Sequence, residues 1–449
     1  MKTSAPQRHS INANFPLLPP ENSSTRLGRM MAIILAAFAL GAAALTAQPN
    51  PPPGFTSTLI TSDVPFPTSL TFGPDGMLYV CAAVDFVDGA VFVVNPATGA
   101  TRHFGDCDGL VSPLGGDLPI GILVDKDGTV FVSDNYVDPD TGIIVGWVRA
   151  LRDTDGDGVA DVNELVVGNL PNGRHDNNNL VFGPDGYIYM PNGNRTDNGI
   201  DGATCFVDGT FGICTNGLAE DPTYSGTILR IDPKRRNQTP ADTKVVARGL
   251  RNVYDIAFWP KDHRFLYIGM NGSDAPETDD LLFRASVQDG KIDDMGFPSC
   301  LYNIGSANGY PLNPMPSPVP DVAELFGLCD TKEIKKLNLP IATFGKHVAV
   351  AGLAFAPGNF ARHYEGDLFA AQFGNNADVP TLTGHRIVRV KIGNDGLPET
   401  DRAGVPIIEH FAFGAGTDTP VDLVFGRDGA MYVADIFNST IHRIERARP

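Results

Sequence analysis

An all-β propeller of six four-stranded blades is predicted by two short phrases that alternate along the 449-residue chain. The first phrase is an apolar strand, an Asp/Gly turn and a second strand, as in FGPDGMLYV at 72–80. The second phrase is a strand with apolar residues at every other position, usually followed by a Pro, Gly or Asp turn. Each phrase recurs six times, the first at 72–80, 122–132, 181–190, 257–268, 354–370 and 424–432, and the second at 89–99, 146–158, 226–236, 279–290, 384–396 and 439–447.

One copy of each phrase supplies about four strands, counting the strand that leads to the next unit. A β-sandwich with coincidental hairpins is the alternative, and the strict alternation disfavours it. Residues 55–62 form a strand that has no blade before it, so we expect it to pair beside the last phrase, near 424–446. This pairing closes the ring by placing the N- and C-terminal strands in one blade, and the propeller is expected to span 54–447.

The composition is acidic and rich in turn-forming residues. A net charge of −18 argues against binding to nucleic acid or to anionic membrane surfaces. The 49 glycines and 36 prolines fit a chain with many turns between strands. The longest insertions, at 191–225 and 291–345, are expected to lie at one rim and to shape a site.

The first 47 residues are predicted to be a leader with a signal peptide, and residues 48–53 a Pro-rich linker. Arg26 and Arg29 precede an apolar run from Met30 to Leu45, which is short for a transmembrane span. We therefore expect export to the periplasm or the cell exterior, without stable membrane insertion after cleavage; an uncleaved anchor is the alternative. Six cysteines in an exported chain suggest disulfides, of which the simplest set is Cys205–Cys214, Cys81–Cys107 and Cys300–Cys329.

The segment DTDGDGVADVNE at 153–164 matches the spacing of an EF-hand calcium loop. Gly158 stands at the required sixth position. Because the loop lies between two strands, calcium is expected to pin a long turn; an acidic turn without metal is the alternative. The six ligand positions are filled by Asp153, Asp155, Asp157, the Val159 carbonyl, Asp161 and Glu164.

The loops that precede the innermost strands point toward the propeller axis, and they carry polar residues suited to catalysis. His175 could act as a general base near neutral pH, or could simply bond its own loop. Arg251 and Asn252 follow in the next blade and could hold a carboxylate or carbonyl, unless Arg251 pairs with a local Asp. His347 lies in a later axial loop. The acidic segment at 271–280 could bind calcium or be solvated.

These elements together resemble the glucose/sorbosone dehydrogenase family, which consists of soluble quinoprotein sugar dehydrogenases with six-bladed propellers. The matching residues are 175–189, 249–252, 271–280 and 428–435. The resemblance implies pyrroloquinoline quinone (PQQ) with Ca²⁺ as cofactors and gives His175 the role of base. It places Arg251 and Asn252 beside the quinone, the bridging Ca²⁺ near the carbonyls of Gly272 and Ser273, and His347 in the place of a cation that neutralises the cofactor.

The sequence thus predicts an exported quinoprotein dehydrogenase that oxidises a sugar, polyol or alcohol and passes electrons to an external acceptor. One alternative is a non-catalytic propeller that binds carbohydrate or protein and carries structural calcium. Another is a calcium-dependent lactonase-type hydrolase, which would need an axial cluster of acids and Asn. The axial loops offer only Asp176, Asp255 and Asp422 for such a cluster.

Overall fold

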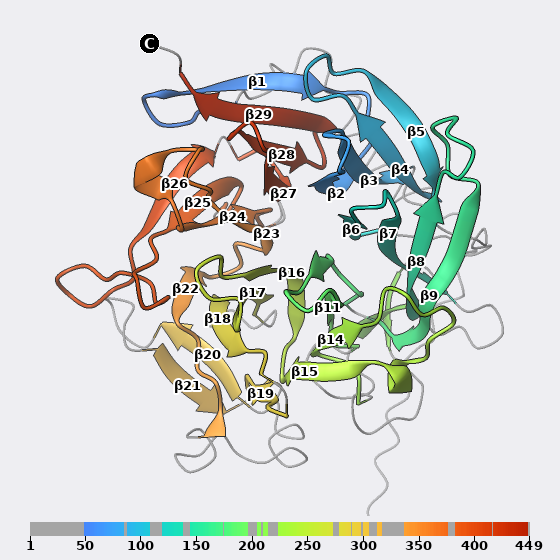
Figure 1. The fold of residues 1–449 in the computed structure, drawn as a ribbon. Coiled ribbons are helices and arrows are strands. Elements are labelled where there is room, and N and C mark those ends of the chain that lie inside the picture. The colour runs from blue at the N-terminus through green and yellow to red at the C-terminus, as the bar shows by residue number, and fades with distance from the viewer. Residues whose placement is uncertain are drawn as a thin grey trace, which may run out of the picture. The chain divides into compact units, whose positions relative to one another are not determined.

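Six β-sheets stand around a common axis in the computed structural model of the chain (Figure 1). The predicted leader at 1–47 and Ser273 lie outside the residues that the structure describes. The described residues are 49–84, 88–107, 119–137, 144–173, 175–195, 204–207, 210–213, 223–272, 278–288, 290–297, 300–304, 312–316, 336–375, 382–414 and 416–447.

The strands follow the order of the two phrases, which confirms the predicted six-bladed propeller. Blade one contains β2 (Pro67–Phe72), β3 (Leu78–Val84), β4 (Asp88–Val94) and β5 (Thr101–Asp106). Blade two contains β6 (Gly121–Val124), β7 (Val130–Val137), β8 (Ile144–Arg152) and β9 (Val162–Pro171). Blade three contains β10 (Val181–Phe182), β11 (Ile188–Asn192), β14 (Thr227–Ile231), β15 (Lys244–Arg248) and β19 (Asp293–Asp294). Blade four contains β16 (Asn252–Phe258), β17 (Phe265–Asn271), β18 (Asp280–Ser286) and β22 (Ala342–Gly345). Blade five contains β23 (Val350–Phe355), β24 (Leu368–Gln372), β25 (Arg386–Val390) and β26 (Ile408–Phe413). Blade six contains β27 (Pro420–Phe425), β28 (Met431–Asp435), β29 (Thr440–Arg446) and β1 (Phe55–Thr61).

The N-terminal strand β1 pairs antiparallel with β29, with Phe55 opposite Arg446. The first strand and the last three strands of the propeller therefore share one sheet (Figure 1). Blade three differs from the expected four strands, because β19 adds a short parallel strand beside β15. This addition covers part of the outer edge of blade three, which would otherwise stay open.

The remaining elements are short and lie within the connections. Among the described residues, no helix is long and apolar enough to span a membrane. The two long insertions each contain a hairpin. These elements are β12 (Thr204–Val207) with β13 (Thr210–Ile213), β20 (Cys300–Ile304) with β21 (Leu312–Pro316), and the 3₁₀ turns η1 (Pro240–Asp242) and η3 (Arg362–Tyr364).

The FGPDG phrase builds the tight hairpin between the first two strands of a blade. In blade one, Asp75 Oδ1 accepts from the Met77 N–H at 3.0 Å and Oδ2 from the Tyr79 hydroxyl at 3.2 Å. A Cβ on Gly73 would lie 2.5 Å from the Tyr79 ring, so only glycine fits under it. The same Asp–Tyr bond recurs at 185 and 189 and at 428 and 432, which explains why this phrase repeats.

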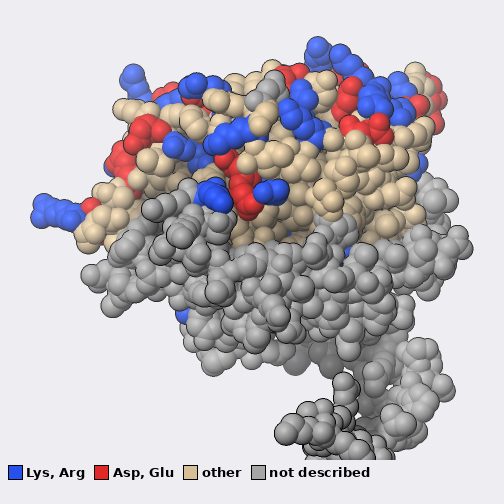
Figure 2. Space-filling model, turned by 90° about the horizontal axis from the view of Figure 1, so that it is seen from below, with Lys and Arg blue, Asp and Glu red and all other residues tan. Residues whose placement is uncertain are grey.

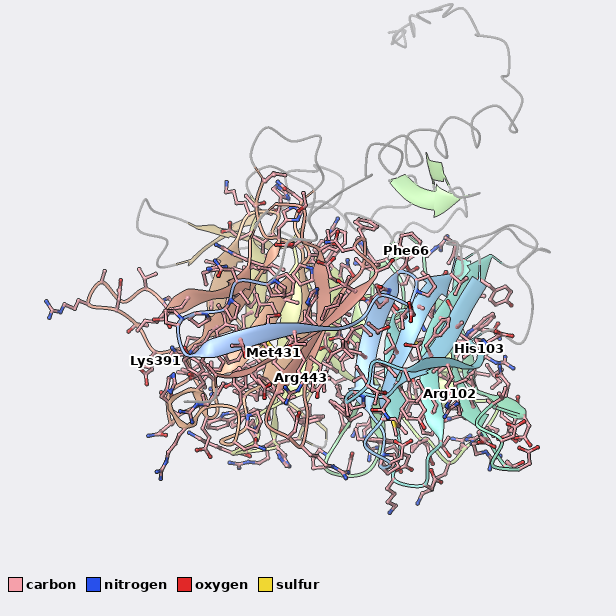
Figure 3. The ribbon with its side chains drawn as sticks, turned by 90° about the horizontal axis from the view of Figure 1, so that it is seen from above. Phe66, Arg102, His103, Lys391, Met431 and Arg443 are labelled. Carbon is pink, nitrogen blue, oxygen red and sulfur yellow. The ribbon has the colours of Figure 1, made fainter. Side chains whose placement is uncertain are left out.

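These hairpins lie at one face of the propeller, and the inner strands begin at the other. Figure 3 shows this arrangement. Phe66, just before β2, lies nearer the face where the inner strands begin, whereas Met431 at the start of β28 and Arg443 on β29 lie nearer the hairpin face. Six apolar clusters fill the spaces between neighbouring blades in the described part of the chain. The core is therefore a ring of inter-blade layers.

The predicted Cys81–Cys107 disulfide is not formed in this structure. Cys81 on β3 is opposite Val91 on β4, which is opposite Gly105 on β5, the strand that Cys107 follows. Positions two strands apart are about 10 Å apart, whereas a disulfide requires Cα atoms within about 7 Å. The Cys81 thiol donates to the Gly121 carbonyl instead, at 3.6 Å. Each of the other two predicted pairs includes a cysteine outside the described residues.

Charged residues of both signs are mixed on the surface. Figure 2 shows Lys and Arg interspersed with Asp and Glu over the coloured part of one side. Several of the arginines of blades three and four are in ion pairs, among them Arg230 with Asp185 at 2.6 Å and Arg235 with Asp242 at 2.8 Å.

Candidate functional site

A ring of polar and glycine positions surrounds the axis, one residue from each inner strand or its entry. We call these six residues the axial ring. The side chains among them are buried. In blade order they are Ser69, Gly121, Asn179, Asp255, Gly352 and Asp422.

The axial ring joins neighbouring blades through hydrogen bonds. Asp422 Oδ2 accepts from the Leu70 N–H and the Ser69 hydroxyl of blade one, both at 2.9 Å. Asp255 Oδ2 accepts from the Leu353 N–H of blade five at 2.7 Å. The other oxygen of each carboxylate accepts from the next N–H of its own strand, at 2.8 Å. The two acids therefore hold neighbouring blades together through their carboxylate oxygens.

Tyr254 closes the axis beside this ring. Its hydroxyl donates to the Thr68 carbonyl at 2.6 Å. Tyr254 belongs to blade four and Thr68 to blade one, and these blades face each other because three steps separate them around the ring. The tyrosine therefore reaches across the axis.

A pocket of about 330 Å³ lies on the axis where the inner strands begin, and we call it the axial pocket. Its walls are mainly apolar and include Ile120, Val350, Ala351, Val421 and Ile436, with Phe373 and Phe437. The polar lining residues are Thr68, Tyr254, Asn252 and Asn271. The last two are opposite each other on β16 and β17, so their side chains give the pocket one polar wall.

Two consecutive residues, Gly193 and Asn194, join the His175 loop to the Arg251 loop through backbone hydrogen bonds. The Gly193 N–H donates to the Asp176 carbonyl at 2.8 Å, and the Asn194 N–H donates to the Arg251 carbonyl at 2.6 Å. His175 is buried, and a Cβ on Gly193 would lie 2.6 Å from its Cβ. Although part of Asp176 reaches solvent, the surrounding protein raises its pKa to about 7 through desolvation.

Arg251 is fixed by a tight turn. Gly249 has φ +71° and a Cβ there would lie 2.6 Å from the Gly296 nitrogen, so the turn requires glycine. The guanidinium of Arg251 is buried, and its Nη1 donates to the Gly272 carbonyl at 2.6 Å. Asn252 accepts a long hydrogen bond of 3.5 Å from Asn178, in the His175 loop. The two predicted loops of successive blades are therefore joined, and Asn252 is the predicted site residue among them that lines the axial pocket.

Asp280 links this group to the fifth blade. Its Oδ1 accepts from the Gly272 N–H and its Oδ2 from the Ala349 N–H, both at 2.8 Å. Burial raises the pKa of Asp280 to about 6, against the opposing effect of these bonds and of the nearby His347 and Arg251 charges. Asp280, at the end of the acidic segment 271–280, is thus buried as a clamp between two axial loops. His347 has φ +51° and lies beside this clamp.

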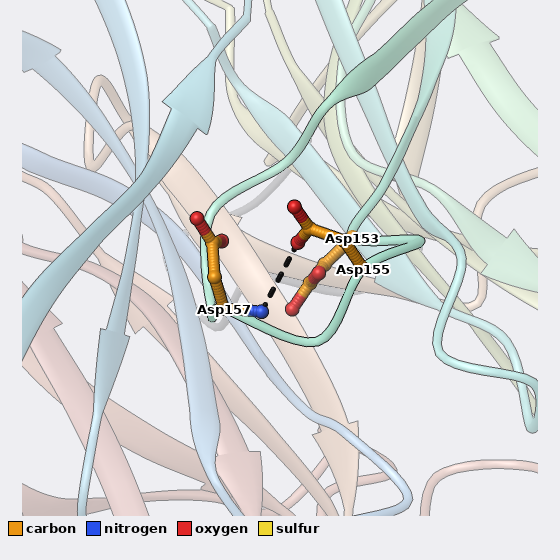
Figure 4. A group of neighbouring side chains, drawn as sticks. All are labelled: Asp153, Asp155 and Asp157. Carbon is orange, nitrogen blue, oxygen red and sulfur yellow. Dashed lines mark hydrogen bonds between the residues drawn. The ribbon is translucent and has the colours of Figure 1, made fainter.

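The predicted calcium loop forms the turn between β8 and β9 (Figure 4), and none of its residues lines the axial pocket. Ligand oxygens of Asp153, Asp155 and Asp157 lie within 4.8 Å of one another. The Asp157 N–H donates to Asp155 Oδ1 at 3.2 Å. Three of the six predicted ligands therefore converge.

The other predicted ligands point to different partners. Asp161 accepts from the N–H of Thr154 at 2.9 Å and from its hydroxyl. Glu164 Oε2 accepts from Arg236 at 2.8 Å and from Arg152 at 3.2 Å, and the Arg236 bond lowers the pKa of Glu164 most. Val159 is exposed, and its N–H donates to Asp157 Oδ1.

Comparisons with known proteins place the fold. No model of a protein family matches the sequence, and no curated protein matches it. Among solved structures, the chain is similar to an iodide structure of a Trichoderma reesei carbohydrate-active enzyme of family AA12, with 15% identity, coverage of 91% of this chain and 100% of that chain, and a TM-score of 0.67. The chain is also similar to the holo form of the pyranose dehydrogenase PQQ domain from Coprinopsis cinerea, with 16% identity, coverage of 90% of this chain and 99% of that chain, and a TM-score of 0.65. The chain shares their fold. The apo form of the soluble aldose sugar dehydrogenase from Escherichia coli has it too, at 15% identity, 88% and 100% coverage and a TM-score of 0.59.

Sequence reasoning found the loops of the site but missed several of its side chains. It gave no role to Phe373 or Phe437, it included Asn271 only as part of the acidic segment 271–280, and it did not reveal the contact that Tyr254 makes across the axis. The signal for Asn271 was present, because it directly precedes Gly272 at the end of an inner hairpin. The two phenylalanines gave no signal, since each is a single aromatic residue in a short connection.

Proposed function

We propose that the chain is an exported oxidoreductase that removes two electrons from a hydroxyl-bearing compound and uses PQQ as its cofactor. The observation that carries the proposal is the joining of the His175 loop, the Arg251 loop and the Asp280 clamp next to Asn252 and Asn271, which line the axial pocket. The fold shared with sugar dehydrogenases supports it. A carbohydrate or related polyol or alcohol is the proposed substrate, and an external acceptor takes the electrons.

The residues at the axial pocket suit the quinone end of PQQ. The amide of Asn252 is a donor for in-plane carbonyl groups, and the apolar walls suit a planar ring. The buried guanidinium of Arg251 belongs to the residue directly before Asn252. The three carboxylates of PQQ would have no cationic partner in the pocket, because none of the residues described as lining it is Lys or Arg. Arg251 and Asn252 would therefore hold the group, with His347 at the neighbouring loop.

When bound, PQQ supplies the two-electron acceptor. The protein's own part is to orient the hydroxyl and to receive its proton. We assign the proton to His175, because an imidazole commonly titrates near neutral pH and this one is fixed by the tight packing of Gly193. His175 would take the hydroxyl proton of the alcohol, and a bound PQQ would supply the acceptor for the hydride, so that the product would be a carbonyl compound.

The test is PQQ-dependent dye reduction by the purified protein in the presence of CaCl₂, across a panel of aldoses, polyols and alcohols. Replacing His175 with glutamine removes the base and is expected to lower kcat by about 10²- to 10⁴-fold. Arg251→Gln is expected to weaken PQQ binding. The matched control is His103→Gln on the outer strand β5, where His103 is exposed (Figure 3), and its kcat should equal that of the wild type.

Failure of PQQ to bind a folded protein in a titration would reject the proposal. The chain would then be a binding propeller that keeps the frame of these enzymes. If His175→Gln and the wild type were equally active, His175 would not be the base, but the proposed oxidoreductase activity would still stand.

We also propose that calcium binds the 153–164 turn and stabilises it. Binding to the folded state alone raises stability by about 2.7 kcal/mol at a hundredfold excess over Kd. Adding CaCl₂ after chelation is therefore expected to raise Tm by several degrees, and Asp155→Ala should abolish that increase. Asp106→Asn, an exposed acid outside the loop, serves as the control. An unchanged calcium response in Asp155→Ala would place the metal elsewhere.

A further inference from the structure

Arg386 on β25 is a partly buried cation without an acid. Its Nε donates to Gln372 Oε1 at 2.9 Å, and that oxygen belongs to a neutral amide. No carboxylate pairs with Arg386 among the residues that the structure describes, and burial alone lowers the pKa of its guanidinium. Arg389 on the same strand shows the usual arrangement, because it is in ion pairs with Asp367 at 2.7 Å and with Glu409 at 2.6 Å. A partly buried charge that lacks a counterion favours the binding of an anion.

The guanidinium of Arg386 has spare donors for such an anion. Of its five N–H groups, four are on Nη1 and Nη2, and only the Nε–H makes a bond in the described part of the chain. Both Nη nitrogens lack a partner there, yet neither is among the unpartnered polar atoms that are buried, so both are open to a ligand. A carboxylate can accept two parallel bonds from a guanidinium, and such a pair is stronger than bonds between neutral groups.

The register of blade five places Arg386 next to the axial pocket. Val350, Gln372 and Arg386 are opposite one another on β23, β24 and β25. Val350 lines the pocket, and so does Phe373, which follows Gln372. Neighbouring strands are about 4.8 Å apart, so the Cα of Arg386 is about 10 Å from that of Val350. The bond to Gln372 directs the Arg386 side chain back toward the pocket wall, which brings its charged end within about one strand spacing of that wall.

A carboxylate matches this position better than other anions do. One planar carboxylate equals a single guanidinium in charge and fits its fork, whereas a phosphate group brings a second charge. Nothing described in the pocket lining offsets a second charge, because the lining includes no Lys or Arg and the chain has a net charge of −18. We propose that Arg386 binds a carboxylate of a small molecule that extends from the axial pocket over the end of blade five.

Two molecules can supply this carboxylate. One is PQQ, whose three carboxylates have no cation among the residues described as lining the pocket, and in that case the inference rests on the proposed function. The other is a substrate that is itself a sugar acid. Both present the same chemistry to Arg386, so the experiment has to separate them.

The test is binding by calorimetry to the full-length protein, with PQQ in CaCl₂, gluconate and glucose as separate probes. For at least one of the two carboxylates, Arg386→Gln is expected to bind at least tenfold more weakly than the wild type. Arg386→Lys keeps the charge but loses the fork, so it should recover only part of the affinity. Arg402→Gln, which removes a positive charge from an exposed turn, should leave binding unchanged. The affinity for glucose, which has no carboxylate, should not depend on Arg386.

The outcomes separate the two sources from each other and from the proposed function. Weaker binding of PQQ alone assigns the site to the cofactor, and gluconate binding that depends on Arg386 assigns it to an acidic substrate. Such gluconate binding without any binding of PQQ would keep the inference and reject the proposed cofactor. Unchanged affinity of Arg386→Gln for both carboxylates would overturn the inference, and intact PQQ-dependent dye reduction would then leave the proposed function in place. Failure of the wild type to bind either carboxylate would overturn the inference too.

Discussion

Replacing Gly352 of the axial ring with alanine is expected to lower the free energy of unfolding by about 3 kcal/mol. A Cβ at this position would lie 2.6 Å from the Cα of Asp422 and 2.9 Å from the Leu423 nitrogen. Both atoms belong to the inner strand of the next blade, so relief requires blades five and six to move apart. That movement would also disturb the bonds that Asp422 accepts from blade one.

Urea unfolding measures the effect, with Gly393→Ala as the control. The nearest atom to a Cβ on Gly393 is a side-chain oxygen of Asp395 at 3.0 Å, which can rotate away. The control is therefore expected to change stability by less than about 0.5 kcal/mol. A Gly352→Ala protein as stable as the wild type would mean that the two inner strands do not approach each other as closely as the structure places them.

The blades could be predicted from the sequence because the information that forms them is local. Within one hairpin, Gly73, Asp75 and Tyr79 fix the turn through contacts that span six residues. The alternation of apolar residues then sets which face of each strand is buried. Six copies of this pattern leave few folds other than a closed ring.

The interior of the site could not be predicted in the same way, because its contacts join residues from opposite blades. Tyr254 bonds the carbonyl of Thr68, 186 residues earlier in the chain. Asp280 looked like part of a solvated acidic segment, and only the folded ring places it between Gly272 and Ala349. The Cys81–Cys107 pairing failed for the same reason, since spacing in sequence does not reveal that a strand intervenes.

The two buried carboxyls of the axial ring are expected to make the protein less stable as the pH rises above neutrality. Burial raises the pKa of Asp422 to about 7 and that of Asp255 well above its ordinary value, with repulsion from Asp422 adding to the latter. A group with a raised pKa binds more protons when folded, so the stability that it confers is complete at low pH. This stability is lost as the pH rises from the pKa of the group in the unfolded chain, near 4, through its pKa in the folded protein.

The window from pH 6.5 to 8.5 isolates this effect. His442 has its pKa lowered by burial to about 4, so its opposite contribution ends near its unfolded pKa of about 6.5. Asp280, with a pKa of about 6, has lost most of its proton by then, whereas Asp176 titrates near pH 7 and adds to the slope. The wild type is therefore expected to lose about 2 to 3 kcal/mol of stability per pH unit around pH 7, because Asp255 remains protonated in the folded state and Asp422 and Asp176 are each about half protonated there.

The decisive comparison is the slope of stability against pH, not its absolute value, because an amide in the axial ring also disturbs hydrogen bonds. Asp255→Asn removes one titrating group and its repulsion on Asp422, so the slope between pH 6.5 and 8.5 should fall by at least half. Asp395→Asn, which alters an exposed turn, should keep the wild-type slope. If all three proteins show the same slope in urea unfolding, the axial carboxyls are ionised throughout this range. The N–H and hydroxyl donors around them would then outweigh the cost of burying their charge, and the axial ring would be held by two anions.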